Sequence, residues 1–409
     1  MAEAGYGLIG EKLGHSFSPY IHGELGNYDY RLIELKRGEL AGFLKRGAFK
    51  GLNVTVPYKK DVMPYCAWLS PEAARIGSVN TIVNTGGLLR GYNTDYYGFV
   101  HMLRTAGIDV KDKKTLVLGS GGASLTVRTA LGDLGARSVT VVSRGGEDNY
   151  GNLERHAGAR VIVNTTPVGM YPNVEAAPLS LDPFPHLEAV ADIIYNPSKT
   201  RLLLDAEKRG LCFANGLAML VAQAKAAAEL FLGRSIPDEK VDEITSLIEK
   251  RTKNILLIGM PGCGKTTVGK LLARALGRGF ADTDELIVKE SGRAIPDIFA
   301  SDGEEAFREL EHSVIAREAK KSSLVIATGG GSVLREDNRD AMRQNSFIVY
   351  IRRDIGELPS AGRPVSQSTP IEELYGRRAP IYEALADAAV DNETSAQAAA
   401  GEIIRRLGL

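Results

Sequence analysis

Cysteine is scarce in this chain: only Cys66, Cys212 and Cys263 occur among its 409 residues. Three such scattered thiols exclude a disulfide framework, and no cysteine–histidine spacing is typical of a zinc site. Net charge is missing too, because 50 basic residues balance 50 acidic ones, so we expect no nucleic-acid partner. No apolar run reaches the about 18 residues of a membrane span, and residues 1–10 lack a signal-peptide pattern. We therefore expect a cytoplasmic protein with no membrane partner.

The length predicts two or three domains. Strand-like apolar runs alternate with helical patterns from Thr115 onward, which indicates α/β architecture with parallel sheets. In the first half, the predicted strands are Thr115–Gly119, Ser138–Ser143, Arg160–Thr166 and Ala189–Asn196. In the second half, strands are predicted within the segments ILLIG, SLVIATGGG and FIVYI.

A helix is predicted over residues 237–250, between the two halves. Val241, Ile244, Leu247 and Ile248 follow a helical spacing there, and the helix reads as the last element of the first half. About four residues, 251–254, are left as a linker.

A phosphate-binding loop lies in the second half. Residues 259–266 read GMPGCGKT, the pattern G-x-x-x-x-G-K-[ST], between an apolar strand and an amphipathic helix at 267–276. Such a loop points free backbone N–H groups at phosphates, while Lys265 reaches the β- and γ-phosphates and Thr266 holds Mg²⁺. The predicted ATP-binding residues are Gly259, Gly262, Cys263, Gly264, Lys265, Thr266 and Thr267.

A second glycine-rich turn, residues 119–124, also follows a predicted strand and precedes a helix at 126–134. Glycines there let the backbone approach a pyrophosphate, although Ser124 stands at the sixth position of the dinucleotide fingerprint. The next strand ends at Ser143 and Arg144, and an arginine without an acid favours the 2′-phosphate of NADP. Two alternatives stay open: a glycine turn that binds no nucleotide, and a solvated Arg144.

Six segments of the first half resemble shikimate dehydrogenase in the order of the chain. They are residues 8–22, 51–61, 77–95, 164–170, 192–200 and 215–224. The resemblance implies NADPH-dependent reduction of 3-dehydroshikimate to shikimate, with Lys59 as proton donor or stabiliser and Asp95 orienting it. The implied substrate-binding residues are Ser16, Ser18, Thr55, Asn80, Tyr195 and Gln223. The implied NADP-binding residues are Gly119, Ser120, Gly121, Gly122, Ala123, Ser143, Arg144, Asn164, Thr165 and Gly216.

The segments after the phosphate-binding loop resemble shikimate kinase. They are residues 281–287, 292–311, 326–333, 361–365 and 377–387. The resemblance implies that Asp284 contacts the acceptor hydroxyl, that Arg308 and Arg378 clamp a carboxylate, and that Gly330 and Gly331 approach the ring. It further implies that Asp282 reaches Mg²⁺ through water and that Arg363, in a lid that looks shorter than usual, neutralises the transferring phosphoryl group.

Simpler interpretations of these kinase-like residues stay open. Asp282 and Asp284 precede an apolar-periodic run and are placed to cap its helix. Glu311, three residues after Arg308, is placed to hold that arginine, and Arg363 fits an ordinary loop cation.

The two resemblances together predict a bifunctional enzyme of aromatic amino acid biosynthesis, a monomer or homodimer that uses NADP(H), ATP and Mg²⁺. We expect a substrate domain at 1–95 with returning helices at 216–250, a Rossmann NADP domain at 96–215, and a P-loop kinase domain at 253–409. The alternatives are a quinate/shikimate dehydrogenase, a kinase for another small polyol acid, or one half that only binds nucleotide.

Overall fold

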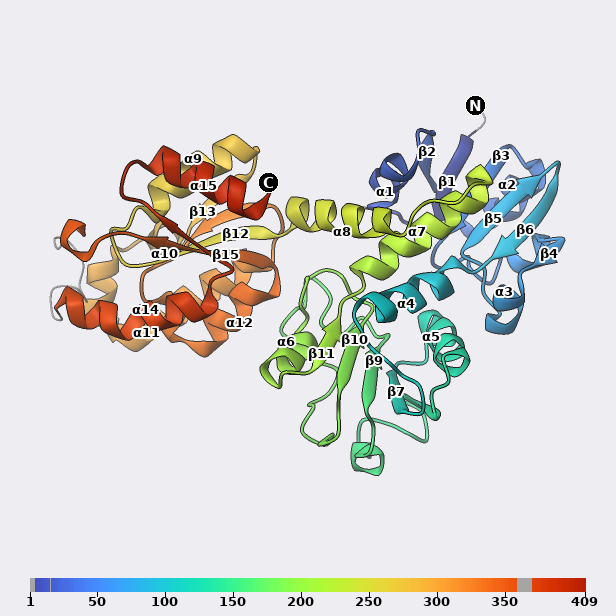
Figure 1. Ribbon diagram of the computed structural model, residues 1–409, viewed down its shortest axis with the longest axis horizontal. Helices are drawn as coiled ribbons and strands as arrows, with labels where there is room; N and C mark the ends of the chain where they lie inside the picture. Colours follow the sequence, from blue (N-terminus) through green and yellow to red (C-terminus); the bar gives the residue numbers. More distant parts are fainter. Residues whose placement is uncertain (1–3, 15, 359–369) are drawn as a thin grey trace. The chain divides into compact units, whose positions relative to one another are not determined.

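The computed structural model describes residues 4–14, 16–358 and 370–409 (Figure 1). Its residues group into two compact units. Unit 1 comprises Met1–Met170, Glu175–Tyr195 and Thr200–Leu247, and unit 2 comprises Tyr171–Val174, Asn196–Lys199 and Ile248–Leu409. Each unit is an α/β structure, so the predicted fold class is confirmed.

Unit 1 contains two sheets, of which the first is mixed. Its strands are β1 (Ala4–Gly10), β2 (Tyr30–Glu34), β3 (Phe49–Val54), β4 (Trp68–Leu69), β5 (Thr81–Thr85) and β6 (Leu88–Tyr92). They are ordered β2-β1-β3-β5-β6-β4, and β5 runs antiparallel to both of its neighbours. The carboxyl end of β3 leads directly to Thr55 and Lys59.

The second sheet of unit 1 is entirely parallel. Its strands are β7 (Lys114–Leu118), β8 (Ser138–Val142), β9 (Val161–Asn164), β10 (Ala189–Asp192) and β11 (Cys212–Ala214), in the order β11-β10-β9-β7-β8. Alternate residues of β7 enter different cores, because Val117 packs in one cluster and Leu116 and Leu118 pack in another. Both faces of this sheet are therefore covered, as parallel sheets require.

The helices of unit 1 complete its cores. They are α1 (Ser18–Leu25), α2 (Leu40–Arg46), α3 (Pro71–Ile76), α4 (Thr94–Thr105), α5 (Gly122–Asp133), α6 (Arg201–Lys208) and α7 (Leu217–Leu232). Short 3₁₀ turns are η1 (Arg37–Glu39), η2 (Met63–Tyr65) and η3 (Leu153–His156). Helices α4 and α7 pack closely because Gly98 lacks a side chain: a Cβ there would lie 2.6 Å from the Met219 carbonyl oxygen.

Unit 2 is built on a parallel sheet that lies between helices. Its strands are β12 (Asn254–Ile258), β13 (Gly279–Asp282), β14 (Leu324–Ala327), β15 (Ser346–Arg352) and β16 (Ala388–Asp391), ordered β13-β14-β12-β15-β16. Its helices are α9 (Lys265–Leu276), α10 (Thr283–Ser291), α11 (Ile295–Ala319), α12 (Glu336–Gln344), α14 (Ile371–Leu385) and α15 (Ala396–Leu407), with 3₁₀ turns η4 (Ser332–Leu334) and η5 (Ile355–Glu357). Helix α11 is kinked at Gly303, where φ is +85°.

Some predicted boundaries shift. Helix α5 begins at Gly122, four residues before its predicted start, because the glycine turn itself enters the helix. Strand β10 ends at Asp192, whose carboxylate accepts hydrogen bonds from the Ile194 N–H and the Thr200 hydroxyl and so turns the chain. Helix α8 (Glu239–Thr252) runs two residues past its predicted end, so only Lys253 separates it from β12. The prediction of a four-residue linker was therefore wrong.

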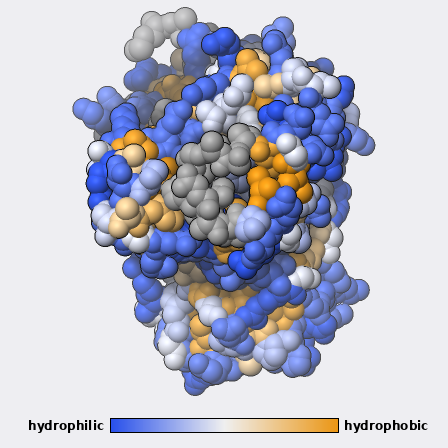
Figure 2. Space-filling model, turned by 90° about the vertical axis from the view of Figure 1, so that its left-hand side faces the viewer, coloured by the Kyte–Doolittle hydropathy of each residue, from blue (hydrophilic) through white to orange (hydrophobic). Residues whose placement is uncertain are grey.

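None of the helices in the described part of the chain combines the length and apolar character of a membrane span. On the face shown in Figure 2, hydrophilic residues cover most of the surface and hydrophobic residues form small separate areas. Small exposed apolar areas are ordinary on folded proteins.

The close packing of α4 on α7 yields a stability prediction. In Gly98→Ala, the added methyl group has no room against the Met219 carbonyl, and we expect the free energy of unfolding of unit 1 to fall by about 1–3 kcal/mol. Trp68 is the chain's one tryptophan and lies in β4 of unit 1, so its fluorescence during urea unfolding measures this change.

Gly132→Ala in α5 is the matched control. No atom lies within 4 Å of a Cβ built at Gly132, so alanine adds helix propensity without a clash. We expect Gly132→Ala to leave the urea midpoint unchanged or raise it. Equal midpoints for Gly98→Ala and Gly132→Ala would contradict the packing argument.

Candidate active sites

The glycine turn of unit 1 opens onto a cavity of about 840 Å³ at the carboxyl ends of β7, β8 and β9. Six of the predicted NADP-binding residues line this cavity: Gly119, Ser120, Gly121, Ser143, Arg144 and Thr165. Gly119 has a φ of +96°, and a Cβ there would lie 2.9 Å from the Thr166 side chain. Helix α5 starts at Gly122, so its unpaired N–H groups lie at the turn, where an anion is favoured. The donor set fits the phosphates of a dinucleotide.

Four other predicted NADP-binding residues do not line the cavity. Gly122 and Ala123 form the first turn of α5, and Gly216 is the N-cap of α7. Asn164 is fully buried: its amide donates to Asp192, and its carbonyl oxygen accepts from the Thr166 N–H and hydroxyl. Asn164 therefore shapes the turn that carries Thr165 and Thr166.

Sequence reasoning missed part of the cavity wall. Thr166, Pro167 and Val168 line it and directly follow the predicted Thr165, so extending that motif would have found them. Tyr150 also lines the cavity beside Arg144, but it lies six residues further along and no local signal marks it.

An ion pair joins Lys59 to Asp95 in unit 1. The Lys59 Nζ donates to Asp95 Oδ2 at 2.6 Å, and the two side chains are 33% and 19% exposed. Lys59 follows β3 and Asp95 lies in the first turn of α4, so two elements far apart in the sequence bring the pair together. The lysine is accessible enough to meet a substrate, and the carboxylate fixes its direction.

A buried polar network holds the start of α4, where Asp95 lies. Asn80 Oδ1 accepts from the Thr94 N–H at 2.6 Å, and Asn80 Nδ2 donates to the Thr94 hydroxyl at 3.0 Å. Thr94 in turn contacts Gln223 of α7, with 3.5 Å between the Thr94 hydroxyl and Gln223 Oε1. Asn80 is only 3% exposed, so its side chain is engaged in placing Asp95.

The remaining predicted substrate residues of unit 1 lie close to the ends of its strands or at the start of α1. Ser16 precedes α1, and Ser18 is its first residue. Both side chains are partly buried, and a hydrogen bond of 3.1 Å joins their hydroxyl oxygens. Tyr195 makes an edge contact with Phe17 at 6.2 Å between ring centroids, and Thr55 follows β3, where its N–H donates to the Ile9 carbonyl.

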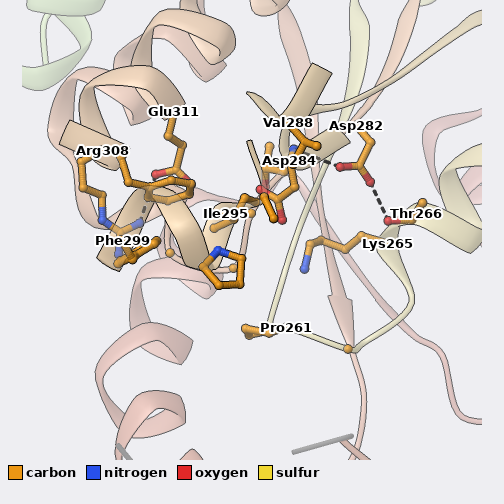
Figure 3. Close-up of a pocket in the computed structure, with 18 of the residues that line it drawn as sticks. Pro261, Lys265, Thr266, Asp282, Asp284, Val288, Ile295, Phe299, Arg308 and Glu311 are labelled. Atoms are coloured by element: carbon orange, nitrogen blue, oxygen red, sulfur yellow. Dashed lines mark hydrogen bonds and ion pairs between the residues drawn. The ribbon is translucent and has the colours of Figure 1, made fainter. Parts of the chain in front are cut away.

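The phosphate-binding loop of unit 2 borders a cavity of about 660 Å³. Figure 3 shows Lys265, Asp284 and Arg308 extending toward this space from α9, α10 and α11. The predicted residues that line it are Gly262, Gly264, Lys265, Thr266, Thr267, Asp282, Asp284, Arg308, Gly330, Gly331 and Arg378. One cavity therefore joins the phosphate-binding loop to two arginines and a carboxylate.

The loop carries a preformed hydroxyl–carboxylate contact. The Thr266 hydroxyl donates to Asp282 Oδ2 at 2.6 Å, while Asp282 Oδ1 accepts from the N–H groups of Asp284 and Glu285 (Figure 3). Asp282 thus caps α10, as the simpler interpretation predicted, and also faces Thr266. A hydroxyl and a carboxylate are oxygen ligands of the kind that Mg²⁺ accepts directly or through water.

Arg308 is held by acidic side chains on its own helix. Its Nη1 donates to Glu311 at 3.1 Å and its Nη2 donates to Glu304 at 2.9 Å. Glu311 is 1% exposed and also accepts from the Ser332 hydroxyl at 2.6 Å. A Cβ at Gly331 would lie 2.7 Å from Arg308 Nη1, so only glycine permits this approach of loop and guanidinium.

Two predicted residues in the described part of unit 2 fall outside the cavity lining. Cys263 is 1% exposed, with its side chain in the core, and Gly259 turns toward β15, where a Cβ would lie 2.4 Å from the Ile351 carbonyl. Arg363 lies outside the described residues. Sequence reasoning also missed an apolar wall formed by Val288, Ile295, Pro296, Phe299 and Phe307, because nothing distinguishes these residues from ordinary core positions.

His22 is a buried histidine behind the Ser16–Ser18 loop. It is 1% exposed, stacks on Tyr30 at 3.9 Å between centroids, and its Nδ1 lies 2.5 Å from the Tyr28 hydroxyl. Tyr30 donates to Asn53 at 2.7 Å, which links this stack to the polar network around Asn80. Burial lowers the pKa of His22 to about 3, so the ring stays neutral in the folded protein.

Two family models match the chain. Residues 8–82 match the shikimate dehydrogenase substrate binding domain, and residues 261–408 match shikimate kinase. The first runs from within β1 to within β5 and includes Lys59 and Asn80, and the second covers most of unit 2.

Curated relatives and solved structures match the first half. A shikimate dehydrogenase (NADP(+)) of Clostridium beijerinckii is 38% identical over 267 residues, which are 61% of this chain and 99% of that protein. A chorismate mutase/shikimate 5-dehydrogenase fusion of Clostridium acetobutylicum is 38% identical, with a TM-score of 0.58 over 61% of this chain and 98% of that one. A Thermus thermophilus shikimate 5-dehydrogenase in complex with NADP(H) and shikimate is 34% identical, with a TM-score of 0.54 over 59% and 97%.

The buried His22 predicts a pH dependence of stability. The unfolded chain takes up a proton at this side chain below about pH 6.5, whereas the folded chain does so only near pH 3, so stability falls as the pH falls between these values. From pH 7.5 to pH 5.0 we expect His22 to lower the free energy of unfolding of unit 1 by about 2 kcal/mol. Urea unfolding followed by Trp68 fluorescence at both pH values measures the drop.

Comparison of His22→Gln with His186→Gln isolates the effect of burial. We expect the His22→Gln protein to be less stable than the parent at pH 7.5. Between pH 7.5 and pH 5.0 its free energy of unfolding should fall by about 2 kcal/mol less than that of the parent. His186 is exposed, and its replacement should leave the drop as in the parent protein. An unchanged drop in His22→Gln would contradict the assignment.

Proposed function

The chain belongs to the shikimate dehydrogenase family and carries a shikimate kinase domain, and we propose that it catalyses two successive reactions. The first is the NADPH-dependent reduction of 3-dehydroshikimate to shikimate. The second is the ATP-dependent phosphorylation of shikimate to shikimate 3-phosphate. The proposal rests mainly on two sites in one chain. One is the Lys59–Asp95 pair, and the other is a phosphate-binding loop that lines the same cavity as Arg308 and Arg378.

We assign three domains to these reactions. Residues 1–95 with the helices of 216–250 bind the dehydrogenase substrate, residues 96–215 bind NADP, and residues 253–409 form the kinase. The relative named shikimate dehydrogenase (NADP(+)) supports NADP as the cofactor of the first half. Arg144 and Ser143, at the edge of the dinucleotide cavity, would hold the 2′-phosphate that distinguishes NADP from NAD.

In the reduction, NADPH supplies the hydride to the ring ketone. The oxygen of the ketone gains negative charge in the transition state, and Lys59 is the cation placed to give it a proton or stabilise it. Asp95 directs the ammonium group of Lys59, and the Asn80–Thr94 contacts hold Asp95. Ser16 and Ser18 supply neutral hydroxyl groups for the substrate carboxylate.

In the phosphorylation, ATP with Mg²⁺ supplies the phosphoryl group. Lys265 and the N–H groups of the loop would bind its phosphates, and Thr266 with Asp282 would hold the metal ion. Asp284 would orient the acceptor hydroxyl and receive its proton. Arg308 and Arg378 would bind the carboxylate of shikimate, for which a planar guanidinium is suited.

A one-pot assay tests the proposal. Purified protein is given 3-dehydroshikimate and NADPH, and NADPH loss is followed before and after ATP and Mg²⁺ are added. We expect shikimate to appear first and shikimate 3-phosphate with ADP to follow. NADPH loss without phosphorylation would show that the chain is a dehydrogenase whose second half only binds nucleotide. If quinate is oxidised faster than shikimate in the reverse direction, the quinate alternative holds.

Lys59→Met gives a sharper prediction for the first site. Removing the ammonium group removes proton donation to the developing alkoxide, so we expect kcat of the dehydrogenase to fall by about 10²–10⁴-fold. Phosphorylation of supplied shikimate by the same variant should be unchanged, which also verifies the amount of folded kinase. Steady-state kinetics of both reactions measure the effect.

Lys60→Met is the matched control, because Lys60 is the next residue and is exposed. Its dehydrogenase kcat should stay within about twofold of the parent value. A similar loss in Lys59→Met and Lys60→Met would assign the effect to the charge of the loop and not to the ion pair with Asp95.

A further inference from the structure

Tyr382 is a buried side chain close to the kinase cavity that the proposed reaction does not use. It lies in α14, four residues and about one helical turn after Arg378, and is 0% exposed. It is absent from the residues that line the cavity, so it lies behind the wall. Any effect on the reaction must therefore pass through residues that do face the cavity.

The hydroxyl of Tyr382 joins two parts of that wall. It donates to the Gly330 carbonyl oxygen at 2.5 Å, and so ties the Gly330 loop to α14, the helix that carries Arg378. Met260, in the phosphate-binding loop, brings its sulfur to 4.0 Å from the same oxygen.

The ring of Tyr382 is fixed by packing. It stacks on Tyr350 of β15 at 5.0 Å between centroids and 30° between planes, inside the core of unit 2. Gly330 is equally constrained from the other side, since a Cβ there would lie 2.6 Å from Pro261 Cδ. Burial raises the pKa of Tyr382, which keeps the hydroxyl protonated and able to donate. The hydroxyl is thus a rigid anchor for the Gly330 loop.

We propose that Tyr382 is a positioning residue for the acceptor substrate of the kinase. Its hydroxyl holds the Gly330 backbone in place relative to α14, so that a carboxylated ring can contact both Gly330 and Arg378. This rests on the proposed function, in which Arg378 binds the substrate carboxylate. Without the hydroxyl, the Gly330 carbonyl loses its donor. The phosphate-binding loop keeps the bonds from the Lys265 ammonium group to the Gly259 and Met260 carbonyl oxygens, so binding of ATP should change little.

The test is Tyr382→Phe in the full chain, which removes one oxygen and keeps the ring. We expect KM and Kd for shikimate to rise by about tenfold, the upper end of what one lost hydrogen bond costs. We expect KM for ATP to stay within about twofold and kcat within a few-fold, because the phosphoryl-transfer residues are untouched. Dehydrogenase activity measured on the same sample serves as the concentration standard.

Tyr350→Phe is the matched control. Tyr350 is the other ring of the stack, and no hydrogen bond found among the described residues joins its hydroxyl to Gly330. We expect its shikimate KM to be unchanged even where thermal stability falls as much as in Tyr382→Phe. Equal shikimate KM and Kd values for the parent, Tyr382→Phe and Tyr350→Phe would overturn the proposal.

Calorimetric Kd values separate this inference from the proposed function. The dehydrogenase site of the same chain also binds shikimate, so the kinase site is measured as the second equivalent bound. If the parent protein binds this second equivalent but does not phosphorylate it, the proposed kinase activity fails, and the ratio of its Kd in Tyr382→Phe to that in the parent still decides the role of Tyr382. If the parent binds no second equivalent in the presence of an ATP analogue and Mg²⁺, both the kinase function and the inference are wrong.

Discussion

Both halves of this protein depend on the same constraint: backbone must approach the ligand where a parallel strand ends and a helix begins. The first N–H groups of a helix have no partner within the helix, so they are available to phosphates only if no side chain covers them. At Gly119 a side chain would meet Thr166, and at Gly264 it would meet the Asn392 amide at 2.3 Å. Both glycines also have positive φ angles, +96° and +100°, which side-chain-bearing residues rarely adopt. The two loops therefore have little freedom of sequence.

Charged groups in both sites are placed by neutral polar contacts behind them. In unit 1, Asn80 holds Thr94, and through it the first turn of α4 with Asp95. In unit 2, the Ser332 hydroxyl donates to the buried Glu311, which accepts from Arg308. Such contacts cost little side-chain entropy, because the partners are already buried and ordered. The charged side chains then need less reorganisation when substrate arrives.

Local pattern was enough to predict the loops and the fold class. Residues 119–121, 262 and 264–267 border cavities as expected, because a glycine-rich turn between strand and helix has one geometry. Position within such a motif did not reveal which way each side chain points. Asn164 and Cys263 belong to the right segments, yet Asn164 is hydrogen-bonded to Asp192 and Cys263 lies in the core. Tyr150 reaches its site only through tertiary packing, so spacing along the chain carries no sign of it. Tyr382 stands one helical turn after Arg378, but its hydrogen bond to Gly330 joins distant parts of the chain.

The pairing of these two activities has a chemical logic that does not depend on how the two units are arranged. Reduction of the ring ketone creates a hydroxyl group, and that same hydroxyl is the acceptor in phosphoryl transfer. Since both sites are on one polypeptide, they are produced in equal amounts at every level of expression. At given concentrations of substrates and cofactors, the ratio of the two fluxes is then set by the rate constants and affinities of the sites. Under the proposed function, Arg308 and Arg378 would therefore help to determine how much of the first product the second site consumes.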